Sequence, residues 1–289
     1  MTDYGHDLLF GTFVTPTAQN PRQAVDLAVT ADRAGIDLVT FQDHPYQPSF
    51  LDTWTLMSYA AARTERVRFT GNVLNLPLRP PAQLARAAAS LDILSGGRFE
   101  LGIGAGGFYE PIAAMGGPQL TAGKAIEALT EAIPIIRDLW DTDARGRVQH
   151  EGTHYTVVGA KRGPKPAHDI GIWIGAYKPK MLALTGAQGD GWLPSMDYLP
   201  DGPASLPDMN ARIDDGAESA GRSPAAVRRL MNFMRADKSP EYLADLALTH
   251  GISGFIFGGD DHAMTERLAA EVAPEVRDLV KRERGAGRD

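Results

Sequence analysis

Short apolar runs alternate with helical stretches along almost the whole chain, and this alternation most limits the possible fold. Strands are predicted at Leu8–Val14, Ile36–Phe41, Arg66–Leu74 and Arg98–Ile103. They recur about every 30 residues, which is the length of a strand–helix unit. Connections that contain a helix join parallel strands, whereas antiparallel strands need only a tight turn. The amino-terminal third of the chain is therefore predicted to form a parallel sheet.

The same alternation continues to the carboxyl end of the chain. Four more strands are predicted at Ile170–Gly175, Gly191–Pro194, Leu230–Arg235 and Ile252–Phe257. Eight parallel strands, nearly each followed by a helix, close into a (β/α)8 barrel. We therefore predict an α/β fold with a single (β/α)8 TIM-barrel domain over residues 1–289. One polar, two-stranded excursion is expected near residues 145–160.

Helix boundaries are marked by capping residues. Asn20 is expected to cap a helix whose first residue is Pro21, and Gly35 is expected to end it. Residues 200–210 are rich in Pro, Asp and Ser and are predicted to form a loop. The other predicted helices are Asp52–Ala62, Ala82–Leu94, Ala122–Trp140, Pro179–Gln188, Asn210–Ala220, one from Ser239 to Gly251, and His262–Arg284.

The composition argues against several classes of function. The 289 residues carry a net charge of −7 and the basic residues are scattered, so nucleic acid is not an expected partner. The chain has no cysteine, which rules out thiolate metal sites and a cysteine nucleophile, and we expect no metal site. No apolar run approaches the ~18 residues of a membrane span. We see no signal peptide either, so a cytoplasmic location without a membrane partner is expected.

A glycine-rich loop follows the fourth predicted strand. Gly102, Gly104 and Gly107 form the pattern G-x-G-x-x-G. Because glycine lacks a Cβ and reaches positive φ cheaply, such a loop can present bare backbone N–H groups to an anion such as a cofactor phosphate. A dinucleotide-binding fold would place this pattern after the first strand, directly before a helix, with an acidic residue about 20 residues later. None of these conditions is met, so we prefer the barrel.

In a (β/α)8 barrel the functional residues lie at the carboxyl ends of the strands. Here those ends are small, glycine-rich or polar, and they include His44 beside Asp43. His44 is a candidate general acid or base, or a hydrogen-bond donor to a bound ring, because its pKa lies near neutrality. Asp43 is a candidate for orienting His44 or for binding a ligand N–H. The alternatives are a loop-capping histidine and a turn-forming aspartate.

Four groups of residues occur in a recognisable order over roughly residues 8–195. They are Gln42-Asp43-His44; Gly71 to Asn75 with Arg79-Pro80-Pro81; Leu94 to Arg98 with Gly102 to Gly106; and Trp173 to Ala176 with Pro179 to Leu182, ending in Gly189 to Trp192. Together they resemble the bacterial luciferase-like superfamily, and within it the branch that depends on the deazaflavin coenzyme F420. The resemblance implies a (β/α)8 barrel that passes a hydride to or from F420 or FMN.

The resemblance also implies roles for single residues around the cofactor ring. Asp43 and His44 would lie at the deazaflavin ring, near its reactive carbon. Asn72-Val73 would match a bulge in the third strand, where F420-dependent members carry a cis non-proline peptide behind the ring. Asn75 would form a hydrogen bond with the cofactor ring or with the side chain of the cofactor. His44 is the expected catalytic residue, with Asp43 in support.

The phosphate of the cofactor and the substrate are assigned by the same resemblance. Ala105-Gly106 and Gly175-Ala176-Tyr177 would hold the cofactor phosphate through backbone N–H groups, and Glu110 would face the opening. The sugar-phosphate dehydrogenases of this branch carry one acid late in the first strand and another directly after the glycine loop. This chain has Val14-Thr15 and Gly107 at those places. Glucose-6-phosphate is therefore not the expected substrate.

Three functions are compatible with these residues. The first is an F420-dependent oxidoreductase that transfers a hydride between the deazaflavin C5 and a small organic substrate. The second is an FMN-dependent luciferase-like monooxygenase, and the bulge pattern favours F420 over FMN. The third is a non-catalytic flavin-binding protein, against which a polar, accessible His44 argues. Relatives suggest a homodimer. The candidates for an apolar substrate pocket, with core packing as the alternative for each, are Trp54, Phe108, Tyr109, Tyr177 and Tyr198.

Overall fold

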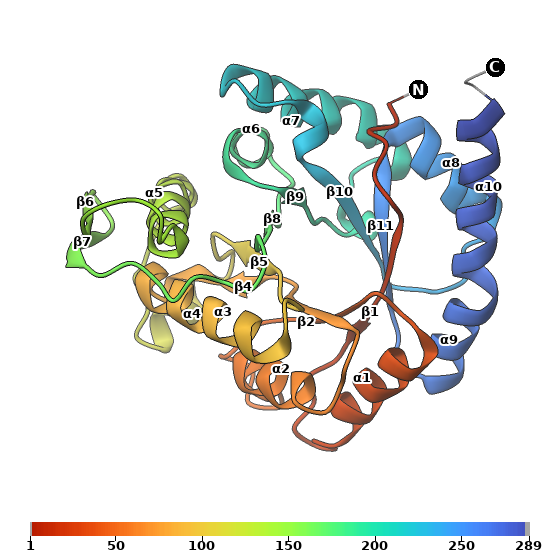
Figure 1. Ribbon diagram of the computed structural model, residues 1–289, viewed down its shortest axis with the longest axis horizontal. Coiled ribbons are helices and arrows are strands. Elements are labelled where there is room, and N and C mark those ends of the chain that lie inside the picture. The colour runs from red at the N-terminus through yellow and green to blue at the C-terminus, as the bar shows by residue number, and fades with distance from the viewer. Residues whose placement is uncertain (1, 287–289) are drawn as a thin grey trace.

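The computed structural model describes residues 2–286, and most of its strands lie side by side in one parallel sheet (Figure 1). The strand order is β3-β2-β1-β11-β10-β9-β8-β5-β4, and every neighbouring pair in it is parallel. The strands are β1 (Leu9–Val14), β2 (Leu38–Phe41), β3 (Arg68–Gly71), β4 (Leu74–Asn75), β5 (Leu101–Gly104), β8 (Ile172–Ile174), β9 (Gly191–Trp192), β10 (Arg228–Phe233) and β11 (Ile252–Gly258).

The two ends of this sheet meet and close a barrel. β3 and β4 are the two halves of the predicted third strand, interrupted at Asn72-Val73. β4 pairs with β5 through Leu74 and Ile103, and Phe69 of β3 forms a parallel bridge with Phe99 just before β5. Counted over residues 2–286, the ring therefore has eight strand positions, because two of its nine strands are halves of one. The predicted (β/α)8 barrel is confirmed.

The helices surround the sheet, and the two ends of the chain lie near each other beside α8 and α10 (Figure 1). Within residues 2–286 no helix is both long enough and apolar enough to cross a membrane. The helices are α1 (Gln23–Ala34), α2 (Thr53–Ala61), α3 (Pro81–Ser95), α4 (Tyr109–Ala114), α5 (Ala122–Trp140), α6 (Pro179–Gln188), α7 (Leu206–Ser219), α8 (Pro240–His250), α9 (His262–Arg267) and α10 (Ala273–Ala286).

Several predicted helix boundaries are confirmed by their capping geometry. Gly35 ends α1 with φ of 88°, a left-handed conformation that glycine adopts without a Cβ clash. The Asp52 carboxylate accepts the Thr55 N–H at 2.8 Å and so caps α2. Ser239 caps α8 in the same way. These side chains replace hydrogen bonds that the first turn of a helix cannot make internally.

Two predicted helix starts were wrong, and two further features of the helices were not predicted. Asn20 does not cap α1, because the chain first forms a turn in which the Asn20 carbonyl accepts the Gln23 N–H, and the helix begins at Gln23. α7 begins at Leu206 inside the predicted loop, since a proline is tolerated in the first turn of a helix. The last helix is interrupted by a π-helical turn at Leu268–Val272, next to Pro274, which has no N–H to donate. α4, which contains Pro111 in its first turn, was not predicted.

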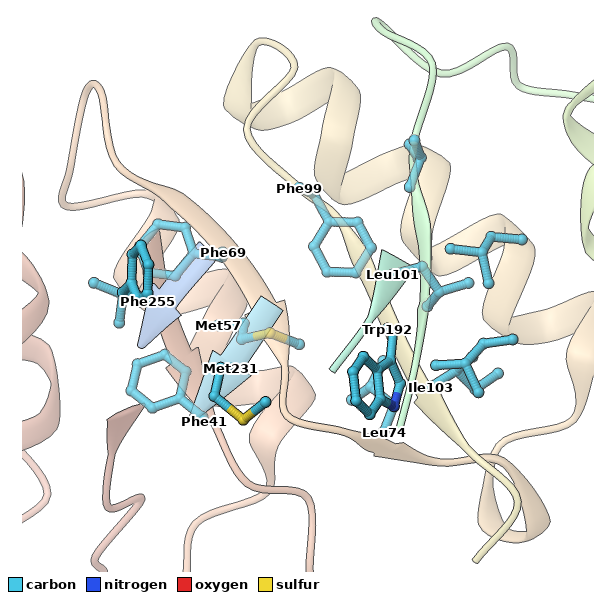
Figure 2. Packing of buried hydrophobic residues seen from close by; sticks show 14 of the residues in the cluster. Phe41, Met57, Phe69, Leu74, Phe99, Leu101, Ile103, Trp192, Met231 and Phe255 are labelled. Atoms are coloured by element: carbon cyan, nitrogen blue, oxygen red, sulfur yellow. The ribbon is translucent and has the colours of Figure 1, made fainter. Parts of the chain in front are cut away.

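The buried side chains form two layers that follow the alternation of each strand. The larger layer lies between strands and helices, and Figure 2 shows part of it, with Phe41, Phe69, Phe99, Leu101, Trp192 and Phe255 from the sheet and Met57 from α2. The smaller layer contains only residues of strands and of the segments next to them, so it fills the inside of the barrel. Its members are Leu38, Trp173, Leu193, Leu230 and Ile256, with Phe13 and Val73 packed against them.

The predicted excursion is a hairpin of β6 (Val148–Glu151) and β7 (Thr156–Ala160), which are antiparallel. It lies outside the barrel, beyond α5 (Figure 1). The Glu131 carboxylate of α5 accepts the N–H groups of residues 153–155 at 2.8–3.1 Å. This carboxylate ties the hairpin turn to the helix. The hairpin takes no part in the barrel sheet.

Candidate functional site

The predicted site residues lie at the ends of four neighbouring strand positions of the barrel. Strand β2 pairs with β3, β4 with β5, and β5 with β8, and all of these strands run in the same direction. Their carboxyl ends therefore meet at one edge of the barrel, here called the site edge. The structure brings together there Asp43, His44, Asn72, Val73, Asn75, Ala105, Gly106, Gly175, Ala176 and Tyr177.

Asp43 is 2% exposed and its carboxylate accepts three hydrogen bonds. Arg79 donates from Nε to Oδ2 and from NH2 to Oδ1, both at 2.8 Å. The backbone N–H of Asn75 donates to Oδ2 at 2.9 Å. Arg79 reaches on to Asp52 at 2.8 Å, and its guanidinium pKa is raised because these carboxylates outweigh its burial. Asp43 therefore holds Asn75 and Arg79 in place.

His44 stands beside two aromatic rings at the site edge. Its ring lies 5.4 Å from that of Tyr46 and 5.3 Å from that of Phe108, and the last two are 5.7 Å apart. Within residues 2–286 neither ring nitrogen of His44 has a hydrogen-bond partner. Burial lowers the pKa of His44, and the nearby Asp43 charge offsets this only in part. His44 is therefore a neutral, half-buried imidazole at pH 7.

Tyr46 and Phe108 complete this aromatic cluster, and sequence reasoning did not connect them to His44. Burial, together with the charge of Asp43, raises the pKa of Tyr46 to about 12, so its phenol stays protonated at neutral pH. Phe108 is 53% exposed, which leaves one face of the cluster open to solvent. The position of Tyr46 two residues after His44 in the sequence could have indicated that the two rings lie close together. Phe108 lies in a different loop, the one between β5 and α4.

The Asn72-Val73 pair interrupts the third strand position, and its peptide bond is cis. The Val73 side chain fills a notch lined by two glycines. A Cβ at Gly104 would lie 2.7 Å from Val73 Cγ2, and one at Gly175 would lie 3.1 Å from the same atom. These glycines therefore make room for Val73 at the top of the barrel interior.

The first two glycines of the pattern have a packing role in the barrel wall. Gly102 belongs to β5, where a Cβ would lie 2.0 Å from the Gly71 carbonyl oxygen. Gly102 and Gly104 are spacers within the barrel wall, and the residues that the resemblance assigned to the phosphate, Ala105 and Gly106, lie in the loop that follows. Gly106 has φ of 80°, and its N–H, like those of Gly107 and Phe108, donates to no protein acceptor in the described part of the chain.

Asn75 carries an unpaired acceptor in a buried place. The residue is 5% exposed, and its Oδ1 atom has no hydrogen-bond partner among residues 2–286. An unsatisfied buried carbonyl costs about 1–3 kcal/mol. Asn75 Oδ1 is therefore a free acceptor at the carboxyl edge of the barrel.

The second predicted phosphate loop lies next to the first, because β5 pairs with β8. The Ala176 carbonyl accepts the Trp192 indole N–H at 2.9 Å, and the Tyr177 hydroxyl accepts the Ser195 N–H at 2.8 Å. These bonds hold the loop while the N–H groups of Ala176 and Tyr177 have no acceptor in the described chain. Of the other candidate aromatics, Trp54 packs on Phe99 at 5.5 Å, which is core packing and not a site contact.

A cavity of about 630 Å³ lies at the opposite, amino-terminal end of the barrel. Its lining includes Arg68, Glu100 and Arg228. Arg68 pairs with Glu100 at 2.8 Å, and the Arg228 guanidinium donates to the Asp7 carbonyl at 2.6 Å. Barrel enzymes react at the carboxyl ends of their strands, and the other end serves stability. We therefore place the functional site at the site edge and not in this cavity.

Comparison with known proteins agrees with the resemblance stated above. The F420-dependent glucose-6-phosphate dehydrogenase of Nocardia farcinica is 29% identical over 301 residues, which cover 96% of this chain and 84% of that protein. An F420-dependent secondary alcohol dehydrogenase, solved with an F420–acetone adduct, has a TM-score of 0.81 at 20% identity and covers 94% of this chain and 100% of its own.

A monooxygenase from Streptomyces bottropensis has a TM-score of 0.75 at 18% identity and covers 96% of this chain and 100% of its own. At such identities the two solved structures show the fold alone. The sequence model for luciferase-like monooxygenases matches residues 3–287, almost the whole chain. The predicted family is confirmed, and the chain belongs to the luciferase-like monooxygenase family.

Proposed function

We propose that this protein is an F420-dependent oxidoreductase that transfers a hydride between the deazaflavin C5 and a small organic substrate. The Nocardia farcinica relative is named for F420, and so is the alcohol dehydrogenase of similar fold. The observation that carries the proposal is the set of groups left open at the site edge. These are the Asn75 Oδ1 atom, the His44 ring nitrogens and the free N–H groups of the two loops, all within the described residues.

These groups fit a flavin-like cofactor with a phosphate-bearing side chain. The Asn75 oxygen is an acceptor for a ring or side-chain donor. The N–H groups of Ala105, Gly106, Ala176 and Tyr177 are donors for a phosphate, whereas the Gly175 N–H already donates to the Ile103 carbonyl at 3.2 Å. The Asn72-Val73 segment lies between them. A bound deazaflavin supplies the hydride chemistry itself, and the protein supplies position and electrostatics.

His44 is the residue we assign to the reacting end of the site. Its neutral imidazole carries one N–H and one free lone pair, so one ring nitrogen can donate a hydrogen bond to a developing negative charge and the other can accept a proton from the substrate. The Tyr46 and Phe108 rings exclude water from two sides of the imidazole. Asp43 acts through position, since its carboxylate holds the Asn75 backbone and is bound by Arg79.

An FMN-dependent monooxygenase is the second candidate, and the similar fold of the Streptomyces bottropensis monooxygenase is the observation that favours it. Titration of the purified protein with F420 and, separately, with FMN separates the two. We expect tight binding of F420 and weak or no binding of FMN. Intrinsic tryptophan fluorescence is a suitable signal, because the Trp192 indole is hydrogen-bonded to the Ala176 carbonyl in a proposed phosphate loop. Binding of FMN alone would overturn the cofactor assignment.

We also propose a substrate other than glucose-6-phosphate. Val14 is buried in the helix-facing layer, and Gly107 has no side chain, so neither place supplies an acid. The exposed rings beside the site, Phe108 and Tyr198, favour an apolar organic substrate. We expect no turnover of glucose-6-phosphate with F420. The absorbance of the oxidised cofactor measures this turnover. Turnover comparable with that of an apolar alcohol would contradict this proposal.

Three broader expectations also remain proposals of ours. They are a single domain over residues 1–289, a homodimer and a cytoplasmic location. The closed ring of strands supports the first. The mass of the protein in solution by light scattering decides between monomer and dimer.

A further inference from the structure

A hydrogen-bonded network inside the barrel connects both halves of the proposed cofactor site. Asn72 donates from Nδ2 to the Asn232 Oδ1 atom at 2.7 Å, and Asn232 donates from Nδ2 to the Asn72 Oδ1 atom at 3.1 Å. Asn72 Nδ2 also reaches the Thr40 hydroxyl at 3.1 Å, and Asn232 Nδ2 the Ser195 hydroxyl at 3.3 Å. The two amides therefore pair with each other and with one hydroxyl each.

This network crosses the barrel from one strand position to its opposite side. Thr40 lies in β2, Asn72 at the break between β3 and β4, Ser195 after β9, and Asn232 in β10. Asn232 is 2% exposed, so its amide has no water to replace these partners. The backbone N–H of Ser195 donates to the Tyr177 hydroxyl at 2.8 Å, which extends the network to the second phosphate loop.

We infer that Asn232 is a positioning residue for the cofactor, because it holds Asn72 and, through Ser195, the Tyr177 loop in one fixed arrangement. Asn232 was not predicted from the sequence, since it lies in an apolar strand and follows no motif. This inference rests on the proposed F420-dependent function. Each amide satisfies the other, so loss of either one leaves a buried polar group unpaired and the Asn72-Val73 segment free to move.

The test compares Asn232→Ser with a matched control, Asn210→Ser. Asn210 is also a buried asparagine, but it bonds the His250 carbonyl and Arg229, away from the site edge. Both variants are expected to unfold at a lower temperature than the wild type. Only Asn232→Ser is expected to weaken F420 binding, by about tenfold, the equivalent of one well-placed hydrogen bond. Affinity is measured by fluorescence titration of the full chain.

Two milder single variants keep the test decisive if Asn232→Ser does not fold. Thr40→Val and Ser195→Ala each remove one hydroxyl from the network and are expected to weaken F420 binding by about threefold. Asn72→Ser combined with Asn232→Ser is expected to bind no worse than Asn72→Ser alone, because the pair acts as a unit.

The outcomes separate this inference from the proposed function. If the wild type binds F420 and the network variants bind it equally well, Asn232 is a structural residue only and the inference is overturned. If the wild type fails to bind F420, the proposed function fails and the inference with it. Weaker binding by Asn232→Ser with unchanged binding by Asn210→Ser supports both.

Discussion

Replacing His44 by Ala is expected to lower turnover with F420 by about 10²–10⁴-fold, the range for a positioned acid or base. The dissociation constant of F420 should change by less than about threefold, since a residue that acts mainly in the transition state contributes little to ground-state binding. The physical reason is that His44 is the half-buried titratable group at the site edge whose ring nitrogens are unpaired in the described chain. Steady-state kinetics and fluorescence titration measure the two quantities.

The pH profile gives a second, independent signature of His44. Burial holds the pKa of His44 below its ordinary value of 6.5, so the neutral form is present at and above neutral pH. If the neutral imidazole is the working form, turnover is full above that pKa and falls as the pH drops through it. His44→Ala should lack this acidic limb. An unchanged acidic limb in the variant would assign it to another group.

Two further variants sharpen the role of His44. His44→Asn retains a side-chain N–H but cannot accept a proton, so partial recovery indicates a hydrogen-bonding role and no recovery indicates proton transfer to His44. His250 is a control histidine in α8, whose pKa is also lowered by burial but which lies outside the site edge. His250→Ala should leave turnover unchanged. Equal activity of wild type and His44→Ala would remove His44 from the mechanism.

Much of the barrel could be predicted because its signals are local. Helix ends such as Gly35 and Ser239 depend on a few neighbouring residues, and they appear where the sequence places them. The failures occur where tertiary contacts override such signals. α7 begins early because Leu206 is buried in the core, although the preceding residues are typical of a loop. Asn20 forms a turn and not a cap, which its residue type permits equally well.

The site was predictable only as a set of strand ends and not as a set of contacts. The topology places Asp43, His44, Asn72 and Asn75 at one edge, and the resemblance selected them. The sequence does not reveal that Arg79, 36 residues away, occupies the Asp43 carboxylate. It also gives no hint that Asn232, 160 residues from Asn72, completes the amide pair. Partners so distant in sequence become visible only when the ring of strands is closed.

Replacing Arg79 by Met is expected to lower the free energy of unfolding by about 3–5 kcal/mol, the usual result of removing one partner of a buried ion pair. Asp43 would keep its charge in a place that is 2% exposed, with only the Asn75 N–H left to stabilise it. Urea denaturation followed by circular dichroism measures the change, with an unchanged slope showing that the folded state remains compact. F420 binding should weaken too, because Asp43 positions Asn75.

Asp52→Asn is the matched control for this prediction. Asp52 meets the same guanidinium at 2.8 Å, but its side chain is 46% exposed, so the pair is worth about 1 kcal/mol or less. Asparagine can still accept the Thr55 N–H, and the cap of α2 is kept. Asp52→Asn should therefore destabilise the protein far less than Arg79→Met, although both remove a contact of Arg79.

Combining Arg79→Met with Asp43→Asn shows whether the buried charge is the cause. The neutral amide that replaces the Asp43 carboxylate no longer requires a guanidinium, so the double variant should be more stable than the sum of the single changes predicts. If Arg79→Met costs no more than Asp52→Asn, water or a backbone shift satisfies the Asp43 carboxylate. Asp43 would then not fix the Asn75 loop, and the proposed division between a reacting His44 and a positioning Asp43 would lose its structural basis.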